Sequence, residues 1–234
     1  EMLLVNFWDN LATRDFNEVE KAMVLTRLSA HLDREEILAR HMGLLGLAAH
    51  EPLLETYLRI ETLNDPVKEA LATKGLSLQS ARSLLDMAPA SRDCVFAWIT
   101  DLHLNGNQQR QFIEMLNDLS LKDNVDISGI LAGEALDRIR RDRESNNPQK
   151  ARNLFSLLRS MRLPLVSGAE KTFHRRVASL GLPRGVTVEH PPFFEGEGYA
   201  LKVLFRDGRD LKGRLETLCR LSLAETLKDP WEEE

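Results

Sequence analysis

Basic side chains that could bind phosphate groups are concentrated in one stretch, residues 138–176. This basic band contains eleven Lys and Arg residues against three acidic ones and so carries a net charge of +8, whereas the whole chain carries −5. Its basic members are Arg138, Arg140, Arg141, Arg143, Lys150, Arg152, Arg159, Arg162, Lys171, Arg175 and Arg176. Most are arginines, whose guanidinium group can donate two parallel hydrogen bonds to one phosphate. The band indicates a nucleic-acid-binding face, with its first six residues as candidate DNA contacts, although ordinary solvent exposure explains any single arginine as well.

Residues that could perform catalysis or bind a metal show no such concentration. The six histidines are scattered without the spacing of a metal site or a catalytic triad, and the two cysteines, Cys94 and Cys219, form no CxxC pair. The sequence therefore predicts no catalytic residue, no metal and no cofactor for this chain, and it favours a binding protein over an enzyme. Two widely separated cysteines also fit a reducing cytoplasm.

The length and overall charge limit the classes of protein further. A chain of 234 residues allows one large or two modest domains, and its net charge of −5 excludes a uniformly basic nucleic-acid-binding protein but not a local basic face. No apolar segment is long enough to span a bilayer and no signal-peptide pattern occurs, so we expect a cytoplasmic protein without a membrane partner. Because the chain begins with Glu1 rather than Met, we expect it to be a fragment.

The first half of the chain has the apolar periodicity of helices. From Asn17 to about Leu119, apolar residues recur every three or four positions, and Gly, Asn, Asp and Pro interrupt the pattern. The interruptions lie at residues 43–46, 64–66, 74–75, 88–89 and 105–107. They predict helices of about 10 to 15 residues, which is an ordinary length in globular proteins. Residues 16–121 are therefore expected to form a mainly α domain.

The segments around this domain differ in composition. Residues 122–147 are polar and basic and are expected to form a connector with one short helix near Leu136. A new helix should begin with Asn147 as its cap and Pro148 in its first turn, which places a domain boundary there. Residues 1–15 precede the helical domain, residues 148–227 form the C-terminal domain, and residues 228–234 form an acidic tail.

The C-terminal domain is predicted to be a small α+β (ααββα) unit. Its expected elements are helices at about 148–163 and 169–180, strands at 186–190 and 199–206, and a last helix from about Leu211. A two-stranded sheet with short helices cannot cover its own apolar face in water, so we expect a homodimer. The candidate dimer-interface residues are Val186, Val188, Leu201, Val203, Phe205, Leu211, Leu215 and Leu218.

The start of the helical domain is similar to a known family. Asn17 and Glu20 have the spacing of a capping box ahead of an apolar helix. Residues 9–22, Asp-Asn-Leu-Ala-Thr-Arg-Asp-Phe-Asn-Glu-Val-Glu-Lys-Ala, resemble the segment that joins the nucleotide-binding domain to the helix-turn-helix domain in ParB DNA-partition proteins. Residues 63–71 and 76–85 are similar to two further runs of that family. The Leu-Gly pair at 180–181 and the Gly-rich loop at 196–198 resemble its dimerisation domain.

This resemblance implies a dimer that binds double-stranded DNA in chromosome or plasmid partition, associated with the bacterial nucleoid, with a ParA-type ATPase as partner. It also implies an N-terminal nucleotide-binding or nuclease-like domain that is absent from this chain and that would use CTP and Mg²⁺ in the full-length protein. Asp9, Asn10 and Arg14 would then be the remnant of that nucleotide site.

The candidate helix-turn-helix consists of a first helix at Asp33–Gly43, ending at a turn glycine, and a second helix at Glu51–Thr62 that would enter the major groove. The candidate groove residues are Arg40, His41, Thr56 and Arg59, supported by Lys74, Gln79, Ser80 and Arg82. The second helix offers three glutamates against one arginine, and the stretch before it is apolar and longer than the family's turn. Because DNA affinity depends on phosphate contacts, such a helix is poorly suited to reading an operator.

Three functions remain open on the sequence. The first is a ParB-like DNA-binding protein. The second is a protein-interaction and dimerisation module whose degenerate helix-turn-helix no longer reads DNA. The third is a fragment of a ParB-like CTPase or nuclease whose catalytic domain lies outside this chain.

Overall fold

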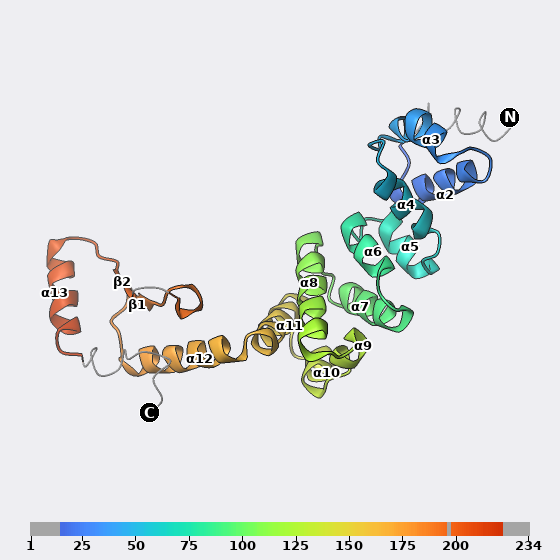
Figure 1. Ribbon diagram of the computed structural model, residues 1–234. Coiled ribbons are helices and arrows are strands. Elements are labelled where there is room, and N and C mark those ends of the chain that lie inside the picture. Colours follow the sequence, from blue (N-terminus) through green and yellow to red (C-terminus); the bar gives the residue numbers. More distant parts are fainter. Residues whose placement is uncertain (1–14, 196–197, 222–234) are drawn as a thin grey trace. The chain divides into compact units, whose positions relative to one another are not determined.

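The computed structural model describes residues 15–195 and 198–221 and divides the chain into two compact units, residues 1–156 and 157–234 (Figure 1). The predicted nucleotide-site remnant (Asp9, Asn10 and Arg14) and the acidic tail at 228–234 lie outside the described residues. The division falls inside helix α11 (Asn147–Arg162), whereas the boundary expected from the sequence falls at the start of that helix.

The first unit is helical, as the periodicity predicts. Its α-helices are α2 (Glu18–Ser29), α3 (Arg34–Glu36), α4 (Glu51–Ile60), α5 (Asp65–Ala72), α6 (Leu78–Leu85), α7 (Pro89–Asp101), α8 (Gly106–Asp123), α9 (Ile127–Leu131), α10 (Glu134–Arg141) and the first part of α11. A π-helical turn, η1 (Ile37–His41), and a 3-10 turn, η2 (Gly43–Leu45), lie between α3 and α4. The mainly α class is confirmed.

Polar side chains start these helices at the predicted interruptions. The Asn17 side chain accepts from the backbone N–H of Val19 and Glu20, and the Glu20 carboxylate accepts from the N–H of Asn17, which confirms the capping box. Asn64, Ser77 and Asn105 cap α5, α6 and α8 in the same way. Each cap satisfies a backbone donor that has no partner within the helix, so these starts are encoded locally.

Two local predictions need correction around residue 147. The cap of α11 is Asn146 rather than Asn147, because the Asn146 side chain accepts from the N–H of Gln149 at 3.0 Å and Gln149 reaches back to the N–H of Asn146 at 2.9 Å. Residues 122–147 contain the short helix predicted near Leu136, which is α10, and also a second helix, α9, that was not predicted. These helices contribute the buried side chains Ile127, Ile130, Leu131 and Leu136.

The core of the first unit joins helices that are distant in the sequence. Helix α2 packs against α4 and α5, α6 contacts α4, α7 and α8, and α9 contacts α7 and α8. Tyr57 on α4 is completely buried, and its hydroxyl donates to the carboxylate of Glu18 at the start of α2. Burial raises the pKa of Tyr57, so the phenol stays protonated and keeps this link. The first helix is thereby fastened to the helix that a helix-turn-helix would present to DNA.

The second unit follows the predicted order of elements. Helix α12 (Pro164–Ser179) begins five residues before the expected start and is followed by β1 (Val186–Glu189), the 3-10 turn η3 (Pro192–Phe194), β2 (Ala200–Val203) and α13 (Gly208–Leu218). The strands are antiparallel, with Val186 opposite Val203 and Val188 opposite Leu201. β2 is shorter than predicted. A small core of Ala169, Phe173, Val188 and Phe194 joins α12 to the strands and the turn.

Candidate nucleic-acid interface

The helix-turn-helix scaffold is present in the first unit. Asp33 caps α3 by accepting from the N–H of Glu36 at 2.8 Å, and the helical path continues through η1 and η2 as far as Leu45. The chain then reverses at Gly46, whose φ of 70° lies in the left-handed region that glycine tolerates. The turn glycine is therefore Gly46 and not Gly43, and the second helix, α4, ends two residues before the predicted Thr62.

The exposed face of α4 is acidic, and its glutamates pair with an arginine of α3. Glu51 and Glu55 lie one turn apart, with side chains that are 46% and 48% exposed, and both contact the guanidinium of Arg34 on α3. The Arg34–Glu55 distance is 3.1 Å, and the hydrogen bonds that Arg34 donates to both glutamates raise the pKa of Arg34. Two carboxylates against one guanidinium leave a net negative charge where a major groove would be received. This face repels phosphates, and its one cation is already engaged.

The four predicted groove residues lie in different environments. His41 and Thr56 are buried, and the Thr56 hydroxyl donates to the carbonyl of Pro52 at 2.8 Å. Arg59 donates to the Asp86 carboxylate at 2.8 Å and to the Leu85 carbonyl at 2.6 Å, so it ties α4 to the end of α6. Arg40 is exposed and pairs with Glu36 at 3.1 Å. The positions of His41 and Thr56 argue against direct contact with bases.

The supporting residues fall in two environments. Lys74, Gln79 and Arg82 are exposed around the start of α6, whereas Ser80 is buried and its hydroxyl lies 2.7 Å from that of Ser77. An open, polar hollow of about 540 Å³ lies beside them, lined by Ser77, Gln79, Asn105, Gly106, Asn107 and Arg110.

Gln109, which was not among the predicted site residues, joins α8 to the loops before α6 and after α7. Its side-chain oxygen accepts from the Ser77 N–H at 3.0 Å, and its nitrogen donates to the carbonyls of Gly75 and Leu104, each at 2.8 Å. Gln109 is buried on the same helical stripe as Phe112, Ile113 and Leu116. A polar residue on an apolar stripe was the signal that could have identified it.

The basic band is divided between the two units. In the first unit, three of its arginines pair with carboxylates: Arg138 with Glu134 at 2.6 Å, Arg140 with Asp101 at 2.5 Å, and Arg141 with Asp137 at 2.8 Å. Arg143 and Arg152 are exposed, and neither makes an ion pair within residues 15–195 or 198–221.

The remaining basic residues of the band belong to the second unit. Arg159 pairs with Glu170 at 2.6 Å, and Lys171 and Arg175 are exposed. Exposed cations of the band are therefore found in each of the two units.

The predicted dimer residues include an exposed apolar set. Val186, Val188 and Leu218 are buried and Val203 and Leu211 are partly buried, whereas Leu201, Phe205 and Leu215 are 46%, 53% and 46% exposed. Leu204, which was not predicted, is more exposed still.

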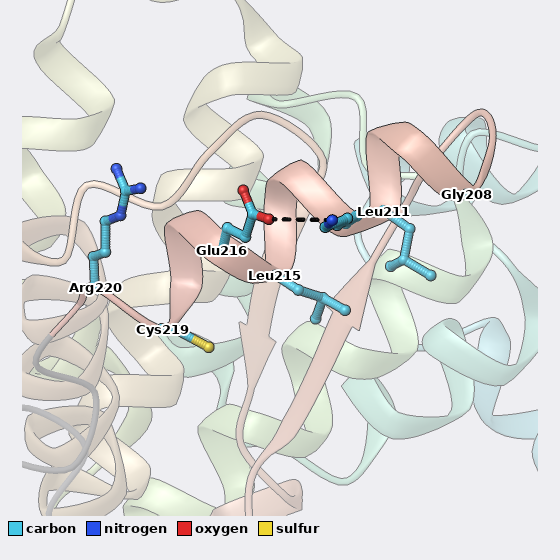
Figure 2. A pocket seen from close by; sticks show the side chains of 7 residues that line it. Gly208, Leu211, Leu215, Glu216, Cys219 and Arg220 are labelled. Carbon is cyan, nitrogen blue, oxygen red and sulfur yellow. Dashed lines mark ion pairs between the residues drawn. The ribbon is translucent and has the colours of Figure 1, made fainter.

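Helix α13 separates its apolar and charged side chains. Figure 2 shows Leu211, Leu215 and Cys219 on one side of α13, with Glu216 and Arg220 on the other. An open hollow of about 520 Å³ runs along the helix. The apolar side leaves large side chains in contact with water, which is typical of an interaction surface.

The part of the chain that the structure describes shows neither a metal-binding cluster nor a membrane-spanning helix. No group of three or more His, Cys, Asp or Glu side chains there is arranged to hold a metal ion. None of the described helices is long and apolar enough to cross a membrane.

Comparison with known protein families gives a match to part of the first unit. The family model of the ParB HTH domain matches residues 14–118, which extend from just before α2 into α8. No curated protein and no solved structure matches the chain. The matched domain is of a DNA-binding and not of a catalytic type. It ends before α9 and the basic band, so the family match does not account for the arginines of α10 and α11.

Proposed function

We propose that this chain, whose residues 14–118 match the ParB HTH domain, binds double-stranded DNA as a dimer. The observation that carries the proposal is the family match, together with the intact scaffold of α3, the Gly46 turn and α4. Because α4 presents Glu51 and Glu55, we assign most of the affinity to exposed cations outside that helix. Lys74, Arg82, Arg143 and Arg152 are the candidates.

The binding mode follows from this distribution of charge. Scattered arginines and lysines contact phosphates and carry no sequence information, whereas sequence is read by contacts to base edges from an element placed in a groove. We therefore infer an affinity for duplex DNA that depends strongly on salt and weakly on sequence. Such binding suits DNA organisation or partition on the nucleoid, in which a ParA-type ATPase would act as the partner.

Fluorescence anisotropy with a labelled random-sequence duplex tests the proposal. The protein should bind at about 50 mM salt and lose most of its affinity by about 200 mM, as expected when phosphate contacts release counterions. Selection of bound sequences from a random DNA pool should enrich no palindrome. Absence of binding at low salt would refute DNA binding, and enrichment of a palindrome would show that α4 or another element reads bases after all.

The dimer is proposed on the exposed apolar set of the second unit. Leu201, Phe205 and Leu215 belong to β2, the segment after it, and α13, and all three remain in contact with water within the single chain. A second copy would cover them by presenting the same surface, as in the usual two-fold dimer. Leu215→Asp should shift the protein to monomer in sedimentation analysis. Thr217→Asp, which places the same charge at another exposed position of α13, should leave the dimer intact; equal effects of the two variants would argue against this surface.

A second candidate function is a protein-interaction module. The observation that favours it is the acidic α4 face, where Glu51 and Glu55 are exposed and bind Arg34 instead of solvent ions. A module of this kind would show no salt-dependent affinity for duplex DNA and would instead bind a cationic protein segment. The anisotropy experiment separates the two functions, because only the DNA-binding protein gives a signal with the duplex.

A further inference from the structure

A basic cleft lies where α10 ends and α11 begins, entirely within the first unit. It is an open cleft of about 610 Å³ lined by Arg140, Arg141, Asp142, Arg143, Ser145 and Lys150. Four of its six lining residues are cationic and one is acidic. The family match ends at residue 118, so this cleft is separate from the helix-turn-helix.

The carboxylates that balance these cations do not line the cleft. Arg140 donates from Nε and Nη2 to a single oxygen of Asp101, at 3.0 and 2.5 Å, and its guanidinium carbon lies 5.7 Å from the centroid of the Trp98 ring. Arg141 pairs with Asp137 one turn earlier on α10. Neither Asp101 nor Asp137 is among the lining residues. Asp101 and Asp137 thus pair with these arginines from outside the lining of the cleft, and Asp142 is the one acidic residue within it.

The one acidic lining residue is engaged in the turn between the helices. The Asp142 carboxylate accepts from the N–H of Glu144 at 2.9 Å and from the N–H of Ser145 at 3.4 Å. Hydrogen bonds from Ser145 and Glu144 lower the pKa of Asp142, so it stays ionised and holds the turn. The Lys150 ammonium donates to the Arg140 carbonyl at 3.0 Å and is thereby fixed beside the end of α10. Arg143 remains exposed and makes no ion pair within the described residues.

We propose that this cleft is a phosphate-binding site, in which Arg143, Arg141 and Lys150 hold one phosphoryl group. The phosphoryl group could belong to the DNA backbone or to a free phosphate or nucleotide. The first source rests on the proposed function, and the second does not. Arginine forks and a lysine ammonium are donors well suited to phosphate in proteins, and the fixed position of Lys150 lowers the entropy lost on binding. The surface pair between Arg141 and Asp137 is weak enough for a phosphate to displace.

Charge reversal at matched positions tests the DNA source. Arg143→Glu changes the cleft, and Arg27→Glu makes the same change in net charge at an exposed position on α2, far from it in the sequence. Loss of one charge-assisted phosphate contact should weaken binding of the random duplex by roughly tenfold and reduce the slope of log K against log salt by about 0.9. Arg27→Glu should change affinity by less than about twofold, because screening removes the effect of a distant charge. Equal effects of the two variants, or no effect of Arg143→Glu on a wild-type protein that binds DNA, would refute the DNA source.

Titration with inorganic phosphate and with a nucleoside triphosphate, without DNA, tests the other source. NMR shifts of the backbone N–H groups of residues 141–145 should move on titration in the wild type and in Arg27→Glu but not in Arg143→Glu. If the wild type binds no duplex, the proposed function fails, and this titration alone decides whether the cleft binds phosphate. If neither the duplex nor the free phosphates respond to Arg143, the cleft is not a phosphate site.

Discussion

The buried amide of Gln109 provides the most direct test of how the first unit is built. Gln109→Met keeps the length and volume of the side chain but removes all three hydrogen bonds to the loop before α6 and the end of α7. The Leu104 carbonyl is buried, and leaving it without a donor costs about 1–3 kcal/mol. The Ser77 N–H and the Gly75 carbonyl are nearer to water, so each costs roughly 0.5–1 kcal/mol. The free energy of unfolding should therefore fall by roughly 2–5 kcal/mol, a large share of the stability of an ordinary domain.

Urea unfolding followed by circular dichroism measures this change. The control is Gln111→Met, the same substitution at an exposed position two residues along α8, which should stay within about 0.5 kcal/mol of the wild type. A difference between the two variants below about 1 kcal/mol would show that the Gln109 amide does not fasten α6 to α8. Gln109 is buried and cannot contact DNA itself, whereas Lys74, Gln79 and Arg82 near it are exposed. Gln109→Met should therefore lower DNA affinity only under conditions in which the first unit is partly unfolded.

Three further predictions follow from the caps and ion pairs. Neutralising the acidic face with Glu51→Gln and Glu55→Gln together should raise affinity for a duplex severalfold in low-salt anisotropy, because two repelling charges are lost and Arg34 is released; an unchanged affinity would mean that α4 does not approach DNA. Asn17→Ala should lower the free energy of unfolding by about 1 kcal/mol in urea, since α2 loses its capping box, and Asn117→Ala, at an exposed position inside α8, should not. The hydrogen bond from Arg214, followed by the one from the Arg206 N–H, lowers the pKa of Asp210, so its stabilisation is present above the unfolded-state pKa and is lost as the pH falls through the lower folded-state value. An NMR titration of the Asp210 carboxyl should show this depressed midpoint, and a midpoint at the ordinary aspartate value would contradict the pair.

Local signals in the sequence predicted the starts of the helices well. The capping box at Asn17 and the caps at Asn64 and Asn105 depend only on residues within one turn, so the spacing of side chains is sufficient to find them. The order of elements in the second unit also follows from short patterns. The cap of α11 was nevertheless predicted one residue too late, because Asn146 and Asn147 are both good caps and only the structure distinguishes them.

Long-range pairings could not be predicted from the same patterns. Arg140 and Asp101 are 39 residues apart, as are Tyr57 and Glu18, and nothing in the periodicity joins them. The burial of His41 and Thr56 was missed for a similar reason, because packing by other helices decides which side of a short helix faces solvent. Expecting only one short helix at 122–147 gave too much weight to the charges of this segment, and too little to the apolar positions of α9.

The contact of Arg34 with Glu51 and Glu55 also bears on how such a domain changes over evolutionary time. Glutamate and lysine codons differ by one base, so a single mutation at either position replaces a repelling group with an attracting one and leaves the Arg34 guanidinium with one carboxylate partner instead of two. The charge on this surface would change by two units in that one step, without any alteration of the buried side chains that hold α4 in place. A domain whose α4 repels DNA and a domain whose α4 attracts it can thus differ by one amino-acid substitution.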